Sequence, residues 1–111
     1  MDRNSITLVG RIGDKIIKKK SANGSTYVWI PIEIQNTQGA TSVERNFHMS
    51  INCMVFTKRL IDYLEKVRAA SGNIIIVFGF VATFKQTING KDIVSNAINA
   101  TEIYIAKTTS D

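Results

Sequence analysis

The residues of this 111-residue chain best suited to chemistry are aromatic rings and lysines. Tyr27 and Trp29 are two positions apart in a segment where Val28 and every second residue up to Ile34 is aliphatic. An extended strand places both rings on the surface opposite these aliphatic residues, about 7 Å apart. Flat rings stack on nucleobases, and neighbouring lysines neutralise phosphates. This combination of rings and lysines predicts that the protein binds single-stranded nucleic acid. The alternative is that Trp29 packs under a loop or against another subunit.

The charge distribution agrees with an anionic partner. The chain has 14 Lys and Arg residues against 9 Asp and Glu residues, a formal net charge of +5. Residues 1–20 hold six of the basic residues and two of the acidic ones. A basic surface of this kind attracts nucleic acid. The alternative is that the lysines only protect the exposed edge of a strand from aggregation.

A second group of aromatic and basic residues lies near an Asn89-Gly90 turn signal. Phe84 and Lys85 precede the turn and Lys91 follows it. The alternative for Phe84 is an aromatic cap on the core. Phe47 and Phe56 bracket a further predicted strand, and alternation places them on opposite faces, so one of the two belongs to the core.

Catalytic and metal sites find little support in the sequence. His48 and Cys53 are the only residues for a Cys-His pair, but they are five positions apart, and a strand directs them to opposite faces. One cysteine and one histidine exclude a Cys-based zinc site within the chain. We also find no glycine-rich phosphate loop and no paired acidic residues. We therefore expect no enzymatic activity, no metal and no cofactor.

The chain also lacks the signals of a membrane or secreted protein. Its start, Met1–Asn4, has no apolar signal-peptide region, which predicts a cytoplasmic location. The longest apolar run, Ile74–Ala82, is less than half of the roughly 20 residues needed to cross a bilayer.

The first half of the chain reads as three strands. They are a long bent strand over Ser5–Lys20, a regular strand over Thr26–Gln35 and a third over Val43–Phe56. The turn signal Asn23-Gly24 separates the first two. Because Pro31 cannot donate a backbone hydrogen bond, it predicts a sheet edge or a bulge in the second strand.

The second half reads as one helix and two strands. The helix covers Lys58–Ala70, with Thr57 as N-cap, Gly72 as C-cap and an Asp62–Lys66 ion pair. A strand over Asn73–Lys85 is apolar on both faces near its start, which predicts burial on both sides. Gly79 within it predicts a sharp bend that closes a barrel. The last strand covers Asp92–Ala106, with an interruption expected around residues 96–99.

This order predicts one domain over residues 1–111. Three strands, a helix and two strands match the five-stranded barrel of the OB-fold, with the helix between the third and fourth strands. An α+β sandwich and an SH3-like barrel are the alternatives. The OB-fold offers the face of its second and third strands, and two hairpins, to an extended ligand.

Several short motifs resemble those of the bacterial single-stranded-DNA-binding proteins. Asn4–Gly13 is similar to the "N…LVG.LG" opening strand of that family, and Phe47-His48 to its aromatic-His pair. Phe56–Leu60 is similar to the "FGK…L" start of its helix, and Gly79 and Asn89-Gly90 continue the match.

This resemblance implies an OB-fold, self-association through β-strands into a dimer or tetramer, and binding of single-stranded DNA with little sequence preference. The implied roles are in replication, replication restart, recombination or repair. By position, the phosphate contacts would come from six basic residues: Arg11, Lys15, Lys18, Lys20, Lys85 and Lys91. The stacking contacts would come from four aromatic residues: Tyr27, Trp29, Phe47 and Phe84.

The chain departs from the family pattern at its end. The disordered linker and acidic tip that recruit partner proteins are absent, which makes a tailless form the expectation and puts recruitment of replication proteins in doubt. The related primosomal replication protein N has a similar length and shares the pattern Gly79-Phe80, Lys85 and Asn89-Gly90. The sequence does not distinguish a tailless single-stranded-DNA-binding protein from a primosomal replication protein N. A third alternative is an OB-fold module that docks another protein and binds no nucleic acid.

Overall fold

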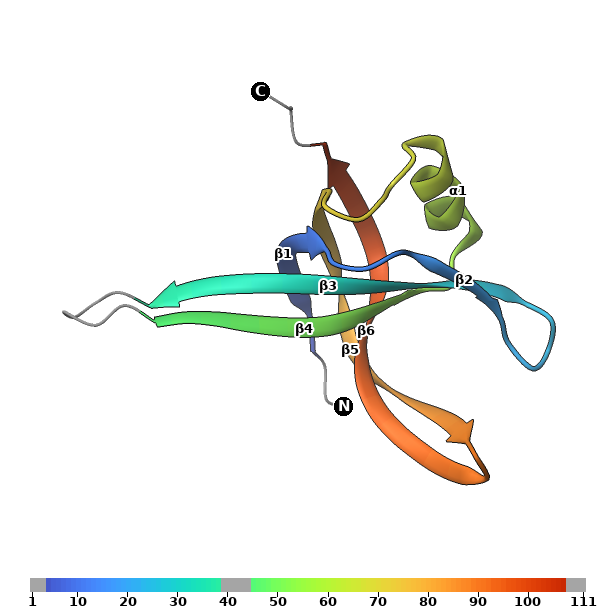
Figure 1. Ribbon diagram of the computed structural model, residues 1–111. Helices are drawn as coiled ribbons and strands as arrows, with labels where there is room; N and C mark the ends of the chain where they lie inside the picture. The colour runs from blue at the N-terminus through green and yellow to red at the C-terminus, as the bar shows by residue number, and fades with distance from the viewer. Residues whose placement is uncertain (1–3, 39–44, 108–111) are drawn as a thin grey trace.

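The computed structural model describes residues 4–38 and 45–107, which form a single closed sheet with one helix. The elements are β1 (Ile6–Ile12), β2 (Ile17–Lys20), β3 (Thr26–Gln38), β4 (Arg45–Val55), α1 (Lys58–Lys66), β5 (Ile74–Ile88) and β6 (Lys91–Ala106). The sheet has the order β1-β5-β6-β4-β3-β2, and an additional pairing of β1 with β3 closes the barrel (Figure 1). This is the predicted OB-fold, with β1 and β2 as the two halves of its first strand.

Alternating aliphatic residues fill the barrel as the sequence predicts. Val28, Ile30 and Ile32 of β3 are at most 3% exposed and face the interior. Leu60 and Leu64 of α1 close one end of the same core. Each such side chain contributes about 1.5–3 kcal/mol when it is withdrawn from water, so the alternation fixes which face of each strand points outward.

The predicted long first strand is divided in two. β1 pairs with β5 over most of its length, whereas β2 pairs with β3. The chain bends between them at Gly13, whose N–H donates to the carbonyl of Pro31 at 2.9 Å. A Cβ at Gly13 would lie 2.8 Å from the exposed Glu33 side chain, so a larger residue at the bend would have to displace that side chain.

Pro31 pairs with Asn52 of β4 on one side, whereas the pairings of β1 and β2 with β3 do not include it on the other side. The expected sheet edge is therefore present locally. The carbonyl of Pro31 points toward the bend between β1 and β2, and in a strand the N–H of a residue points to the same side as its carbonyl. The backbone N–H that proline lacks would therefore point to the gap between β1 and β2, where β3 has no regular hydrogen-bond partner strand.

The bend at Gly79 is confirmed. The β5–β6 register shifts between Phe78 and Gly79, and a Cβ on Gly79 would lie 2.1 Å from the carbonyl oxygen of Asn99. The extra residue on β6 is Thr101, whose hydroxyl donates to the carbonyl of Phe78 at 3.0 Å. The interruption predicted at residues 96–99 is wrong, because β6 runs through them and its irregularity is at Thr101.

The helix is shorter than predicted. α1 begins after Thr57, as expected, but it ends at Lys66, and Arg68 adopts a left-handed φ of 55°. Gly72 is therefore not the C-cap; its N–H donates to the carbonyl of Ile12 at 2.7 Å. Asp62 pairs with Lys58 at 2.7 Å instead of with Lys66.

Two hairpin arms extend from the barrel (Figure 1). One consists of the outer parts of β3 and β4, and the other of the outer parts of β5 and β6. The second turns at Asn89 and Gly90, which have φ angles of 52° and 79° and confirm the predicted hairpin tip. This arm carries the predicted residues Phe84, Lys85 and Lys91.

The first part of β5 is buried on one face only. Ile75 and Val77 are inaccessible, whereas Phe78 on the opposite face is 38% exposed. The predicted burial on both sides is therefore wrong for the single chain. No helix in the described part of the chain is long and apolar enough to span a membrane.

Candidate nucleic-acid interface

A row of three aromatic rings lies on the outside of the barrel. Tyr27 of β3 stacks on Phe56, with ring centroids 5.5 Å apart and an interplanar angle of 30°. Phe56 stacks in turn on Phe84 of β5, at 5.8 Å and 23°. Tyr27 faces outward because its neighbour Val28 points into the core. Three segments distant in sequence therefore build one continuous aromatic platform.

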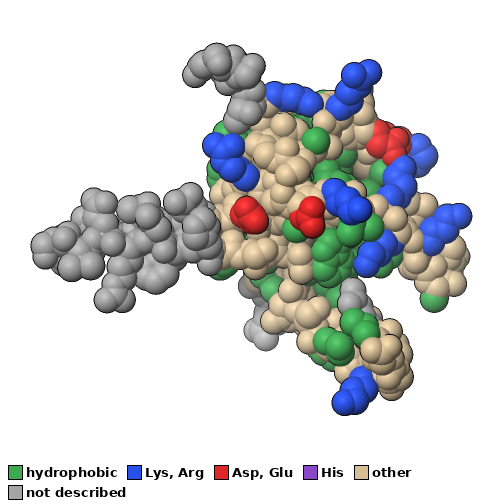
Figure 2. All heavy atoms as spheres, in the orientation of Figure 1, with side chains coloured by type: hydrophobic (Ala, Val, Ile, Leu, Met, Phe, Trp, Pro, Cys, Tyr) green, Lys and Arg blue, Asp and Glu red, His purple; other side chains and the backbone are tan. Residues whose placement is uncertain are grey.

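The aromatic row lines a groove of about 730 Å³ between the barrel and the β5–β6 arm. Met54, which is 4% exposed, contributes to the apolar lining. The residues that line it are Lys19, Lys20, Ser21, Ala22, Tyr27, Met54, Phe56, Phe84, Lys85, Thr87 and Ile88. Figure 2 shows hydrophobic side chains at this junction, with Lys and Arg side chains beside them.

Trp29 lies next to the row on the same outer surface. Its ring is half-buried, and the ammonium group of Lys19 lies 5.3 Å from the ring centroid, a cation–π contact. The β2–β3 register brings the two together, because Lys19 is opposite Tyr27 and Ile17 is opposite Trp29. Trp29 is thus partly covered by a cation of its own chain, and Lys19 contacts the predicted stacking surface.

The cations of the groove come from both of its sides. Lys19 and Lys20 approach from β2, and Lys85 approaches from β5. The ammonium group of Lys85 lies 3.2 Å from a carboxylate oxygen of Asp92. Lys91 is exposed beside the arm's tip, opposite Ile88. Aromatic faces and cations therefore line the same groove.

Four of the six predicted phosphate contacts do not line this groove, and Lys91 at the arm's tip is one of them. Lys18 points to the opposite face of β2, where it forms an ion pair with Glu65 of α1. Arg11 donates to the carbonyl of Gly72 at 3.2 Å. Lys15 is exposed in the bend between β1 and β2.

The structure also locates the backbone of Phe47. This residue pairs with Asn36 on the β3–β4 arm, and its side chain lies outside the described part of the chain. Its predicted stacking role therefore stays a prediction.

The sequence reasoning missed two residues of the site. Alternation alone does not say whether Phe47 or Phe56 belongs to the core, and the structure shows Phe56 43% exposed at the centre of the row. Its outward direction could have been read from the alternation in β4, since Cys53 and Val55 point inward. Lys19 shares a face with Tyr27 and Trp29 once β2 is paired with β3, but the sequence alone does not give that register.

The described residues offer no arrangement for nucleophilic or metal chemistry. Cys53 is fully buried in the barrel core, and this burial raises the pKa of its thiol to about 12. A neutral, inaccessible thiol is not a nucleophile. No group of His, Cys, Asp and Glu residues within the described ranges is placed to hold a metal ion.

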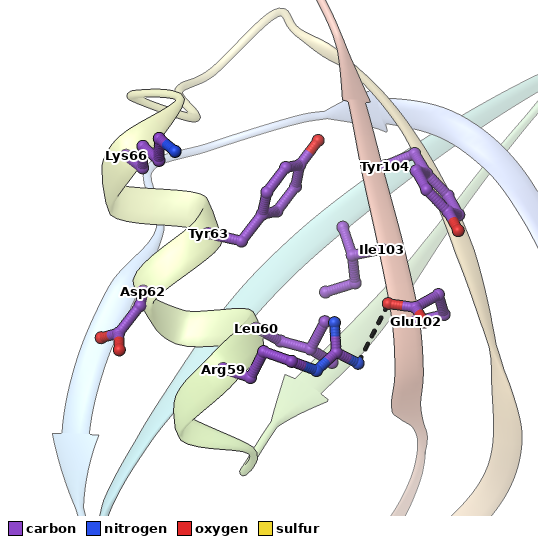
Figure 3. A pocket seen from close by; sticks show the side chains of 8 residues that line it. All are labelled: Arg59, Leu60, Asp62, Tyr63, Lys66, Glu102, Ile103 and Tyr104. Carbon is purple, nitrogen blue, oxygen red and sulfur yellow. Dashed lines mark hydrogen bonds and ion pairs between the residues drawn. The ribbon is translucent and has the colours of Figure 1, made fainter.

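A second hollow, of about 460 Å³, lies between α1 and β6 (Figure 3). Arg59 forms an ion pair with Glu102 across it at 3.2 Å. The Tyr63 hydroxyl accepts a hydrogen bond from the N–H of Ile105 at 2.9 Å. Its charges have both signs, and the ion pair and the hydrogen bond connect helix to sheet across it. We therefore interpret it as part of the packing between α1 and β6.

Comparison with known proteins gives the fold a name. No protein-family model and no curated protein matches the sequence. The SSB of Plasmodium falciparum, solved in complex with ssDNA, is similar with a TM-score of 0.80 and 17% identity, over 96% of this chain and 97% of that chain. The chain has the fold of a single-stranded-DNA-binding protein.

Two other solved structures agree. The small single-stranded DNA-binding protein of Streptomyces coelicolor gives a TM-score of 0.71 at 17% identity, over 96% of each chain. The mitochondrial single-stranded DNA binding protein Rim1 of S. cerevisiae gives 0.72 at 21% identity, over 99% of this chain and 100% of that chain. The match covers nearly the whole of each chain, both arms included.

Proposed function

We propose that this protein is a non-enzymatic member of the single-stranded-DNA-binding proteins and binds single-stranded DNA with little sequence preference. The proposal rests mainly on the aromatic row Tyr27–Phe56–Phe84, which lies within a groove edged by lysines. Every base has a flat face, so stacking on such a platform does not depend on sequence. The fold shared with proteins named for this activity supports the proposal.

Each part of the groove has a physical role in this proposal. Bases stack on the ring faces that the aromatic row leaves open, contributing about 1–3 kcal/mol for each base. Lys19, Lys20, Lys85 and Lys91 neutralise phosphates along the backbone and so add a salt-dependent contribution. Duplex DNA keeps its bases stacked inside, so the rings have little to contact in it. The proposal thus requires preference for single strands.

A second part of the proposal concerns self-association. Val9, Phe78 and Tyr104 form an exposed apolar surface on the outer face of β1, β5 and β6, with exposed fractions of 57%, 38% and 52%. A face of this kind is typical of an interface between copies. We propose that a second copy of the chain covers it, leaving the groove free. Roles in replication, restart, recombination or repair in the cytoplasm belong to the same proposal.

The test is a titration of Trp29 fluorescence with oligo(dT) and with a matched duplex at several salt concentrations. Trp29 is the single tryptophan and adjoins the aromatic row, so its fluorescence reports on the site. We expect binding of the single strand with log K falling against log salt at a slope of about −3, the value for about four phosphates on a single strand. Equal binding of duplex and single strand, or a flat salt dependence, would contradict the proposal.

A protein-docking module predicts a different result. In that case oligo(dT) leaves the fluorescence of Trp29 unchanged at all salt concentrations. Replacing Trp29 with Ala then dissociates a protein complex instead of weakening DNA binding.

A further inference from the structure

One cation of the groove already has a carboxylate partner. Lys85 lies 3.2 Å from one oxygen of Asp92, and the other oxygen accepts a hydrogen bond from the Thr87 hydroxyl at 2.9 Å. The β5–β6 register explains this arrangement, because Asp92 is directly opposite Thr87 and diagonal to Lys85. Thr87 therefore holds the carboxylate beside the ammonium group.

The two sides of the groove differ in this respect. Lys19 and Lys20 on the β2 side have no carboxylate within ion-pair distance among residues 4–38 and 45–107, whereas Lys85 on the arm does. The remaining lysine of β2, Lys18, forms an ion pair with Glu65 and points away to α1. A phosphate that reaches the arm side meets a cation that is partly neutralised.

We propose that Asp92 competes with nucleic-acid phosphate for Lys85 and so lowers the affinity of the arm side of the groove. The inference rests on the proposed binding of single-stranded DNA. Both partners of the pair are more than half exposed, and such pairs are weak enough for a phosphate to displace the carboxylate. The displaced Asp92 stays within about 8 Å of the phosphate, where salt does not fully screen their repulsion.

The competition has a consequence for how the strand lies. Phosphates bind more tightly on the β2 side, beside Lys19 and Lys20, than on the β5–β6 arm. Removing the carboxylate alone raises the affinity of the arm side for phosphate, and it does so without a new contact.

The test is a comparison of Asp92→Asn with the full-length wild-type chain in oligo(dT) binding at low salt. Asparagine keeps the shape of the side chain and its hydrogen bond from Thr87, so the hairpin is retained. We expect Asp92→Asn to bind about threefold more tightly, within the range of an exposed ion pair. We also expect a salt slope steeper by up to about 0.7, the contribution of one fully available cation on a single strand.

A matched control separates competition from a general change in charge. Asp62→Asn removes the same charge from an exposed i,i+4 pair with Lys58 on α1, outside the groove. We expect its affinity to stay within about 1.5-fold of wild type. The gain from Asp92→Asn should also vanish when Lys85 is replaced by Met, as a double-mutant cycle measures.

Each outcome decides the matter. A gain that appears equally in Asp62→Asn, or that persists without Lys85, overturns the competition and leaves the proposed function intact. The same holds if wild type binds oligo(dT) and Asp92→Asn binds no tighter. If the wild-type chain does not bind oligo(dT), both the proposed DNA binding and the competition by Asp92 are refuted.

Discussion

At the scale of single residues, Phe56 is the centre of the candidate site. Its ring contacts Tyr27 on one side and Phe84 on the other, at centroid distances of 5.5 and 5.8 Å. A base between two rings needs about 7 Å, twice the contact distance of about 3.5 Å. No base therefore fits between the rings. Bases stack on the ring faces that the row leaves open, and Phe56 holds the two outer rings in place.

Phe56→Ala should therefore weaken oligo(dT) binding by about 1–3 kcal/mol, which corresponds to about 5- to 150-fold. The expected loss of stability is small, because the ring is 43% exposed in the wild type. Fluorescence titration gives the affinity, and thermal unfolding gives the stability. Phe56→Tyr, which keeps a flat ring, is the control that should bind like wild type. Normal affinity of Phe56→Ala would exclude the platform from the binding site.

At the scale of the elements, the β5–β6 hairpin owes its bend to Gly79. At this residue the strands approach so closely that a Cβ would lie 2.1 Å from a backbone oxygen of Asn99. Two backbones cannot move apart locally without breaking the ladder on either side. The bend also sets the direction of the arm that carries Phe84 and Lys85.

Gly79→Ala should accordingly destabilise the fold by about 3 kcal/mol, at the upper end for inserted atoms in a packed interior. Gly24→Ala is the comparison, because a Cβ there meets nothing within 4 Å and only the φ of 87° is strained. That variant should lose about 1 kcal/mol. Urea unfolding measures both, and equal losses in the two variants would show that the close contact at Gly79 relaxes freely.

At the scale of the whole molecule, the outer face of β1, β5 and β6 carries large apolar side chains that the single chain leaves exposed. Phe78 and Tyr104 meet edge to face there, with centroids 6.1 Å apart. Val9 on β1 lies two residues along from the partner of Phe78. Water contact with these side chains is unfavourable, and a second copy would remove it.

We therefore expect the wild-type chain to sediment as a dimer or larger assembly at micromolar concentration, and Tyr104→Glu to shift it toward the monomer. Ile93→Ser is the matched control, since Ile93 is 45% exposed on the arm, away from this face. It should leave the sedimentation coefficient unchanged. A wild-type monomer at these concentrations, or the same shift with Ile93→Ser, would refute this interface.

The local features of this protein follow from short stretches of its sequence. They are the inward face of Thr26–Gln35, the turn at Asn89-Gly90, the bend at Gly79 and the start of the helix after Thr57. Alternation, turn chemistry and capping act over a few residues, so neighbouring positions are sufficient to predict them.

Which of these features meet depends on contacts between distant segments of the folded chain. Strand register, which joins distant segments, placed Phe56 between Tyr27 and Phe84 and set Lys19 over Trp29. The same register turned Lys18 toward Glu65 and away from the groove. A shift of one residue exchanges the two faces of a strand, so only the paired sheet could separate the lysines of the site from those outside it.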